Sequence, residues 1–362
     1  MLSVYIHIPF CNKICSYCDF CKIYYNEKYV DKYLDKLKDE ILSRYRGEVI
    51  GSIYIGGGTP SSLNIDELDK LLSIIGIFKL DNNYEYTIEC NIESIDIDKI
   101  NLFKSYGINR ISFGVESFDK DILKILERDS NEEIIFDNID LTKKYFDNIN
   151  IDLIYGVNDN IDIVKRDIDK FLSLDIPHIS CYSLILEEHT KLYINNYKCI
   201  NEDIDKDMYE YIKNTLINNG YKHYEISNYA RDGYESIHNK NYWLNGEYYG
   251  FGLGAVSYLD NYRINNTKNM SKYFNGEYIS DKIYEDIRVQ KENELILGLR
   301  LIDGINVNDF NLKYNDDLLN REVISKLITD GYLVVKDGKL KCVEKYIYVE
   351  NNILEKIIGS DL

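Results

Sequence analysis

Four cysteines lie within eleven residues near the start of the chain, at Cys11, Cys15, Cys18 and Cys21. The first three have the spacing C-x3-C-x2-C. One short loop with this spacing can present three thiolates to three corners of an iron-sulfur cube, which leaves one iron without a protein ligand. An iron that is open in this way can bind a substrate or a cosubstrate.

A structural zinc site is the alternative for the same cysteines. Zinc prefers a closed tetrahedron, which proteins commonly build from two C-x2-C pairs. The chain has a single cluster, because its other cysteines are scattered, and this cluster follows a short apolar stretch and precedes a long helical pattern. That position is typical of a loop at the rim of an α/β barrel. We therefore favour an iron-sulfur cluster at Cys11, Cys15 and Cys18, and the role of Cys21 stays open.

A second motif, at residues 56–60, reads GGGTP. Glycines let the backbone approach a ligand closely, and their amide groups can donate hydrogen bonds to a carboxylate. A glycine triplet taken alone is more often an ordinary turn. This one follows the second predicted strand, one crossover after the cysteine loop, and that position favours a ligand-binding role.

The elements that must position these motifs alternate between β-like and helical patterns. Strands are predicted at 4–8, 52–55, 84–89, 110–115, 149–154 and 178–185. Helices are predicted at 28–46, 66–77, 96–106, 119–146 in two pieces, 161–173 and 203–219. This alternation predicts an α/β fold in which six parallel strands form a partial (β/α)6 TIM-like barrel. The motifs then lie at the carboxyl ends of strands, where such barrels carry their chemistry.

The rest of the chain has a different character. We expect a core barrel at residues 1–220, an extension of glycine- and tyrosine-rich loops within 221–287, and a C-terminal domain at 288–362. The last part reads as helix, short helix, helix and a tight hairpin at 336–339, an α+β arrangement that resembles a winged helix. We expect this domain to pack on the barrel or cover a substrate, rather than to bind DNA.

Charge and composition limit the partners. The chain has 43 basic and 61 acidic residues, which argues against non-specific nucleic-acid binding. No stretch reaches the roughly 20 apolar residues that span a bilayer. The first residues lack a basic region followed by an apolar core, so we expect no secretory signal. Clustered thiols without an export signal predict a cytoplasmic protein.

Together these motifs resemble the radical S-adenosylmethionine (SAM) superfamily. The resemblance continues through Glu89, residues 110–117, Arg128 and residues 151–156, and then through residues 224–230, 238–243 and 250–255. In this order the segments are similar to the anaerobic coproporphyrinogen III oxidase family. The similarity covers nearly the whole chain.

The resemblance implies a set of cofactors. In this family three cysteines hold a 4Fe-4S cluster, and the amino and carboxylate groups of S-adenosylmethionine chelate its fourth iron. By position the ligands are Cys11, Cys15 and Cys18, while Tyr5 and Tyr17 lie where the family contacts the cosubstrate.

Further binding positions follow from the same resemblance. Glu116 stands where the family usually has glutamine, an exchange that replaces an amide with a carboxylate. Without the resemblance, Glu89, Arg128 and Asp152 would each suggest a surface salt bridge or a helix cap. The remaining positions that match the cosubstrate site are Gly57, Gly58, Thr59, Glu89, Arg128 and Asp152.

Three observations bear on the subfamily. Only ten residues precede Cys11, whereas the oxidase has a longer chain with a substantial segment before the cysteine loop. Phe20 stands where the oxidase has a fourth cysteine. Residues 238–243, HNKNYW, match the H-N-x-x-Y-W signature of the HemW-type heme chaperones. This match implies that His238 binds heme iron and that Tyr242 and Trp243 stack on the porphyrin. The alternative is that the two aromatic residues cap the barrel while His238 bonds a backbone carbonyl.

The resulting expectation is a heme chaperone that carries a 4Fe-4S cluster and S-adenosylmethionine. Its expected partners are heme, an electron donor and an apo-hemoprotein acceptor, which could be membrane-associated. Turnover of a porphyrinogen is not expected, and cleavage of S-adenosylmethionine stays open. The alternatives are an oxygen-independent coproporphyrinogen III oxidase and a zinc-stabilised scaffold.

Overall fold

Six parallel strands form the centre of the fold in this computed structural model, which describes residues 1–359. They pair in chain order, from β1 through β4, β5, β6 and β7 to β8, and each lies on a strand that the sequence predicts. The α/β class and the partial-barrel arrangement predicted from the sequence are thus confirmed. The strands are β1 (Ser3–Ile8), β4 (Val49–Gly57), β5 (Lys79–Asn91), β6 (Arg110–Glu116), β7 (Asn148–Tyr155) and β8 (His178–Ser183).

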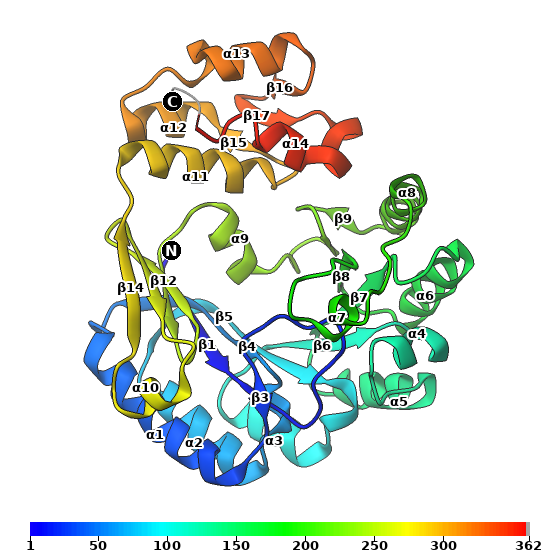
Figure 1. The fold of residues 1–362 in the computed structure, drawn as a ribbon, viewed down its shortest axis with the longest axis vertical. Helices are drawn as coiled ribbons and strands as arrows, with labels where there is room; N and C mark the ends of the chain where they lie inside the picture. The colour runs from blue at the N-terminus through cyan, green and yellow to red at the C-terminus, as the bar shows by residue number, and fades with distance from the viewer. Residues whose placement is uncertain (360–362) are drawn as a thin grey trace.

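Helices connect these strands and lie along the outer side of the sheet (Figure 1). The predicted segment 119–146 divides into two helices, as expected. In α2, Leu68, Leu71, Leu72 and Ile75 are buried at helical spacing, and a capping box from Asn64 begins the helix. The helices are α1 (Glu27–Arg44), α2 (Ile65–Ile75), α3 (Ile97–Ser105), α4 (Lys120–Ile125), α5 (Glu132–Thr142), α6 (Ile161–Leu174) and α8 (Glu202–Asn218).

The core lies between the sheet and these helices. Aliphatic and aromatic side chains of the central strands, such as Ile6, Ile55, Ile111 and Phe113, are completely buried. A parallel sheet that is covered on its faces buries long runs of such residues, and their burial removes apolar surface from water. Polar side chains on these strands are therefore exceptions, and they concentrate at the site described below.

Residues 221–287 differ from the prediction. We expected glycine- and tyrosine-rich loops within this segment, but six short strands, β9 to β14, lie in it and extend the sheet to twelve strands. The prediction was wrong because these strands are short and pair with β8 and β1, which lie far away in the sequence. The added elements are β9 (Lys222–His223), β10 (Asn228–Ala230), α9 (Ile237–Trp243), β11 (Tyr248–Phe251), β12 (Val256–Leu259), β13 (Tyr262–Asn266), α10 (Met270–Phe274) and β14 (Ile279–Tyr284).

The C-terminal segment has a hydrophobic cluster of its own and lies at the top of Figure 1. Its hairpin is confirmed, since Asp337 and Gly338 both have positive φ between β16 and β17. The likeness to a winged helix and the domain limits at 220 and 287 stay predictions, and residues 360–362 lie outside the described part. The elements are α11 (Ile287–Leu299), β15 (Ile305–Asn306), α12 (Val307–Tyr314), α13 (Glu322–Thr329), β16 (Leu333–Lys336), β17 (Lys339–Cys342) and α14 (Glu350–Leu354).

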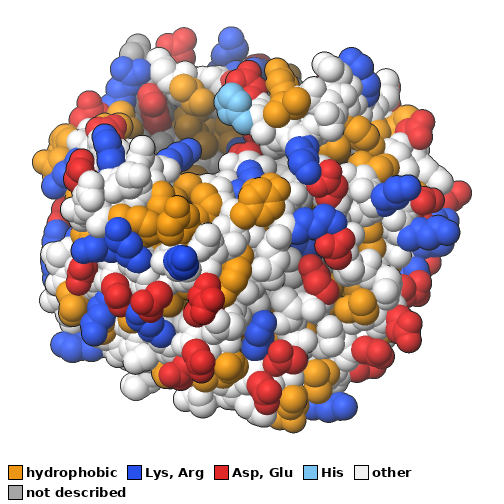
Figure 2. Space-filling model, turned by 60° about the horizontal axis from the view of Figure 1, so that its bottom comes forward, with side chains coloured by type: hydrophobic (Ala, Val, Ile, Leu, Met, Phe, Trp, Pro, Cys, Tyr) orange, Lys and Arg blue, Asp and Glu red, His pale blue; other side chains and the backbone are white. Residues whose placement is uncertain are grey.

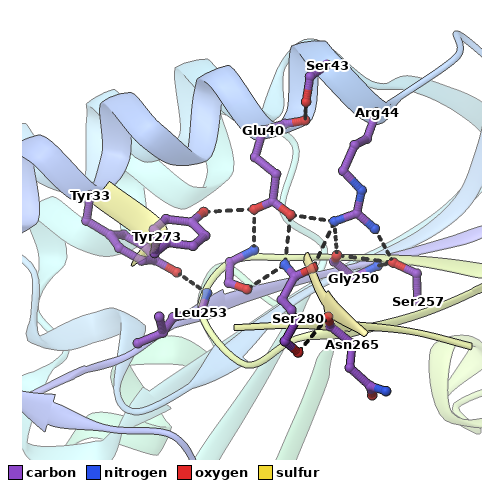
Figure 3. Close-up of polar contacts among 12 residues, drawn as sticks. Tyr33, Glu40, Ser43, Arg44, Gly250, Leu253, Ser257, Asn265, Tyr273 and Ser280 are labelled. Carbon is purple, nitrogen blue, oxygen red and sulfur yellow. Dashed lines mark hydrogen bonds and ion pairs between the residues drawn. The ribbon is translucent and has the colours of Figure 1, made fainter. Parts of the chain in front are cut away.

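A buried polar network fixes α1 to the added strands (Figure 3). The carboxylate of Glu40 is fully buried and accepts hydrogen bonds from the Tyr273 hydroxyl at 2.8 Å, the Asn266 amide at 2.7 Å and the Gly252 backbone N–H at 2.9 Å. The Arg44 guanidinium lies 2.5 Å from the same carboxylate. Burial raises the pKa of Glu40, while these partners favour the ionised form. The network thereby holds the helix that follows the cysteine loop.

The surface and the helices bear on the expected partners. On the face shown in Figure 2, basic and acidic side chains are interspersed, and a hollow near its upper edge contains hydrophobic side chains. Among residues 1–359, no helix combines the length and the apolar character that crossing a membrane requires.

Candidate functional site

A cavity of about 450 Å³ lies at the carboxyl ends of the central strands, beside the cysteine loop. It brings together most of the residues that the sequence predicts for the site. Each strand from β4 to β7 contributes at or near its end, which is the position expected for a barrel of this kind. The predicted residues that line the cavity are Cys11, Cys15, Tyr17, Cys18, Gly57, Gly58, Thr59, Glu89, Glu116, Arg128 and Asp152.

The cysteine loop is closed at its base by a short parallel pair, β2 (Phe10–Cys11) with β3 (Ile23–Tyr24). Cys11 is buried, whereas Cys15 and Cys18 are half-buried. A Cβ on Gly58 would lie 2.9 Å from the Cys11 sulfur, so only glycine fits there without displacing the loop. The second motif thus leaves room for the first.

Two polar side chains approach the thiols. The Thr59 hydroxyl lies 3.7 Å from Sγ of Cys11, and Nη1 of Arg128 lies 3.6 Å from Sγ of Cys15. Burial raises the pKa of Cys11 to about 11, and it also raises the pKa of Cys18. These thiols are therefore protonated at neutral pH until a metal centre displaces their protons.

Three thiols on one loop are a donor set that suits an iron-sulfur cluster. Among residues 1–359, no three Cys, His, Asp or Glu side chains converge on one point where a single metal ion could bind. In a cubane each thiolate binds a different iron, so three ligands need not converge. Cys21 is half-buried, and it does not line the cavity.

Three carboxyl groups form the opposite wall. Glu89 accepts hydrogen bonds from the Tyr54 hydroxyl at 2.7 Å and from the Gly57 backbone N–H at 3.0 Å. Asp152 accepts hydrogen bonds from Asn150 at 3.0 Å and from Ser112 at 3.3 Å. Their oxygens are thus held in fixed directions at the carboxyl ends of β5 and β7.

Burial changes the protonation of these groups. It raises the pKa of Glu89 and of Glu116 to about 7 each, and it raises the pKa of Asp152. The positive charge of Arg128 opposes this effect at Glu116. Glu116 also has φ at +69°, in the left-handed region that non-glycine residues rarely adopt. The wall therefore combines a strained backbone at Glu116 with three carboxyl groups whose pKa burial raises.

Two guanidinium groups complete the cavity. Arg128 donates to the Asn91 side chain at 2.9 Å and to the Gly114 carbonyl at 2.5 Å. Arg110 lies on β6 and lines the cavity as well. The Nε atoms of both Arg128 and Arg110 are buried without a hydrogen-bond partner. A carboxylate ligand suits such donors, because buried polar groups are almost always paired.

Several polar residues that line this cavity were not predicted from the sequence. Their signal was present, because polar residues recur at alternate positions of otherwise apolar strands, as in Arg110 and Ser112 of β6. The missed residues are Tyr54, Asn91, Arg110, Ser112, Asn150, Ser180 and Tyr182.

Tyr5 is placed differently from the other predicted cosubstrate contacts, since it does not line the cavity. Its hydroxyl lies 2.9 Å from Nδ1 of His7, and Nε2 of His7 lies 2.7 Å from the carbonyl oxygen of Cys21. Tyr5 therefore contributes to the position of the cysteine loop.

The HNKNYW residues lie on α9, away from the cavity lining except for Asn239. His238 is only 1 % exposed, and burial lowers its pKa to about 3. Its Nδ1 lies 2.9 Å from the Ser52 hydroxyl and its Nε2 lies 2.9 Å from the Tyr242 hydroxyl, so both nitrogens are engaged. Trp243 is half-buried with the Arg300 guanidinium 5.9 Å from its ring.

Comparisons with known proteins agree with this fold. The sequence profile of the radical SAM superfamily matches residues 5–168. The coproporphyrinogen III oxidase HemN from Escherichia coli has the same fold, with a TM-score of 0.87 at 23 % identity over 99 % of this chain and 90 % of that one. The chain thus has a radical SAM fold, as predicted.

Two full-length relatives narrow the class. A protein named heme chaperone HemW from Lactococcus lactis is 38 % identical over 99 % of this chain and 98 % of its own length. A protein of the same name from Bacillus subtilis is 35 % identical over 99 % of this chain and 100 % of its own length. The chain therefore belongs to the HemW family within the radical SAM superfamily.

Proposed function

We propose that this protein is a heme chaperone, which binds heme and transfers it to an apo-hemoprotein. One observation carries this proposal: proteins named heme chaperones are 35–38 % identical to it along nearly the entire chain. The HNKNYW sequence on α9 adds the motif that led to the same expectation.

We further propose that Cys11, Cys15 and Cys18 hold a 4Fe-4S cluster in the cavity. Their thiols line one cavity, and Gly58 leaves space beside Cys11. When bound, a cluster with an open iron supplies one-electron chemistry toward S-adenosylmethionine. The electron must come from a donor protein or a reductant, which we count among the partners.

The remaining cavity residues suit S-adenosylmethionine, a cation that also carries a carboxylate. Backbone groups at residues 57–59 would face its methionyl end, while Arg128 and Arg110 offer unpaired Nε donors to the carboxylate. Glu89 and Asp152 would balance the positive charges of the ligand. Tyr17 and Glu116 complete the wall, whereas Tyr5 acts through His7 on the cysteine loop.

Heme is the cargo in this proposal. His238, Tyr242 and Trp243 are the heme contacts that the family resemblance implies. In the present arrangement His238 can ligate iron only after its hydrogen bond to Tyr242 opens, because the imidazole is buried and both of its nitrogens are engaged. The first contact with heme thus requires another group or a movement of α9.

We also propose that the protein works in the cytoplasm. All eight cysteines are free thiols, which suits a reducing compartment. The acceptor hemoprotein could be soluble or membrane-associated.

Hemin titration of the purified, cluster-loaded protein tests the function. We expect a shifted Soret band that saturates at a single heme per chain. The same preparation, incubated anaerobically with coproporphyrinogen III, S-adenosylmethionine and dithionite, should form no protoporphyrinogen. Formation of protoporphyrinogen without any change in the hemin spectrum would show that the chain is an oxidase instead.

A further inference from the structure

The five histidines of the chain differ sharply in availability. His7, His178 and His238 each have both ring nitrogens within hydrogen-bond distance of polar partners. His223 bonds a backbone carbonyl at 3.3 Å, and burial lowers its pKa to about 4. His189 alone is exposed, and its side chain has no hydrogen bond, ion pair or ring contact within residues 1–359. It is the one imidazole that can accept an exogenous iron as the chain stands.

A defined turn presents this imidazole. The backbone N–H of Thr190 donates to the Glu187 carbonyl at 3.2 Å, and the Thr190 hydroxyl donates to the same carbonyl at 2.7 Å. His189 occupies the third position of this turn with φ at +74°. Histidine adopts such a φ more often than most non-glycine residues, and the two hydrogen bonds to the Glu187 carbonyl close the turn around it. The His189 backbone is therefore fixed rather than a random part of a loop.

The turn lies at the rim of the cavity, next to the cysteine loop. Glu187, two residues before His189, lines the cavity. On the other side, the short helix α7 (Lys191–Ile194) contacts the cysteine loop, since the Leu192 N–H donates to the Ser16 carbonyl at 3.0 Å. His189 is thus placed between the cavity and an anchored helix.

Large apolar side chains are exposed at the same rim. Phe20 on the cysteine loop is 64 % exposed and Ile185 after β8 is 68 % exposed, and both line the cavity. Tyr182 lines it too and is 41 % exposed. Exposed apolar groups gathered around one cavity indicate a binding surface, and a flat apolar macrocycle is the type of ligand that they suit.

Two lysines provide the complementary charge. Lys13 and Lys22 line the cavity beside Phe20. Lys13 pairs with the exposed Asp129, and Lys22 donates to the Cys18 carbonyl, so both could exchange these partners for a carboxylate. The rim therefore combines an imidazole, apolar walls and cations, which match the iron, the ring faces and the propionates of heme.

We infer that heme docks at the mouth of the cavity, between Phe20 and Ile185, with His189 as the ligand of its iron and with Lys13 and Lys22 facing its propionates. This inference rests on the proposed heme-binding function. A neutral imidazole donates a nitrogen lone pair to the iron, so ligation displaces only water or hydroxide and requires no redox step. Heme held there would close the cavity that the three cysteines line.

The test is a hemin titration of the full-length, cluster-loaded protein and its His189→Asn variant, because asparagine tolerates positive φ while it lacks the imidazole. We expect the variant to lose the shifted Soret band and about 10- to 100-fold in affinity. Added free imidazole should restore the band in the variant, which a merely structural role of His189 would not produce. Asn196→Gly is the matched control, since Asn196 is also exposed with positive φ in the same segment and glycine adopts that φ, and it should bind hemin like the wild type.

Other outcomes would overturn the inference in distinguishable ways. Unchanged binding in His189→Asn, together with loss in His238→Ala, would assign the iron to the motif on α9 and leave the chaperone function intact. Loss only in Cys199→Ser would assign it to the exposed thiol of the segment that follows α7. Wild-type protein that binds no hemin would contradict the proposed function itself.

Discussion

The hydroxyl of Tyr242 lies 2.9 Å from Nε2 of His238, one helical turn away on α9. Ser52 on β4 lies at the same distance from the other nitrogen, so the imidazole links α9 to the central sheet. The HNKNYW motif therefore has a structural role in this arrangement, whatever its part in heme transfer.

Replacement of Tyr242 tests this structural role. Tyr242→Phe should lower the free energy of unfolding by about 1 kcal/mol, because one buried hydrogen bond is lost. The hemin spectrum should stay unchanged if His189 is the ligand. Chemical denaturation measures the loss, and Tyr145→Phe, at an exposed tyrosine, should leave stability unchanged. A new Soret position in Tyr242→Phe would show that His238 becomes a ligand once it is released.

The cysteine assignment predicts which thiols are needed for iron. After anaerobic reconstitution, Cys15→Ala should lose most of its bound iron and sulfide, because the cluster loses one of its three protein ligands. Cys21→Ser should retain both, since Cys21 does not line the cavity. Iron and sulfide analysis gives the result. Equal iron loss in the two variants would make Cys21 a ligand, and stoichiometric zinc in the wild type would favour the scaffold alternative.

The Glu40 network predicts a large stability effect far from the cavity. Glu40→Leu leaves the nearby Arg44 without its carboxylate partner and removes the acceptor of three further hydrogen bonds. The free energy of unfolding should fall by about 3–5 kcal/mol, as it does when one member of a buried ion pair is removed. Tyr273→Phe, which removes one donor only, should cost about 1 kcal/mol. Equal and small losses in both variants would refute the importance of the network.

Two buried acids predict how stability depends on pH. Glu350 on α14 is 2 % exposed with both carboxyl oxygens unpaired, and Glu225 has one unpaired oxygen. Burial raises the pKa of Glu350 to about 8 and that of Glu225 to about 7, and the negative charge of Glu225 raises the pKa of Glu350 further. Arg300 opposes both shifts.

The sign of the pH effect follows from these shifts. The folded protein binds the two protons more tightly than the unfolded chain, so their contribution to stability is complete below the ordinary carboxyl pKa and is lost as the pH rises toward about 8. The contribution of these two acids to the thermal midpoint should therefore decrease between about pH 5 and pH 8, so the midpoint of the wild type should fall relative to that of Glu350→Gln over this range. Glu350→Gln should flatten this dependence and stabilise the protein by about 1–3 kcal/mol at the upper end, whereas Glu355→Gln at an exposed position should not. A difference between the midpoints of the wild type and Glu350→Gln that stays constant over this range would contradict the assignment.

The central part of the fold could be predicted because its strands and helices each have a recognisable local pattern of apolar residues. Residues 52–55, for example, form the buried middle of β4, and apolar residues recur there in a run that only a buried strand explains. Pairing of residues 3–6 with residues 248–251 has no comparable signal. Such a contact depends on the whole chain being folded, and the short strand β11 has too few residues to show a period.

In the candidate site too, residues on one loop could be predicted, whereas residues brought together from separate strands could not. Cys11, Cys15 and Cys18 were found by spacing, because ligands on one loop must follow the geometry of their cofactor. Arg110 and Tyr182 were missed, since their side chains reach the cavity only when separate strands lie side by side. The resemblance assigned Tyr5 to the cosubstrate site, but in the structure Tyr5 contacts His7 and does not line the cavity.

The most direct test of the chaperone proposal is the transfer of bound heme to apo-myoglobin, whose heme-bound form has a Soret band of its own. We predict that the wild-type protein, loaded with a single heme and separated from free hemin, passes its heme to the acceptor until the myoglobin band is complete. The account would be contradicted if the loaded protein retained all of its heme in the presence of excess acceptor, or if no heme remained bound after separation.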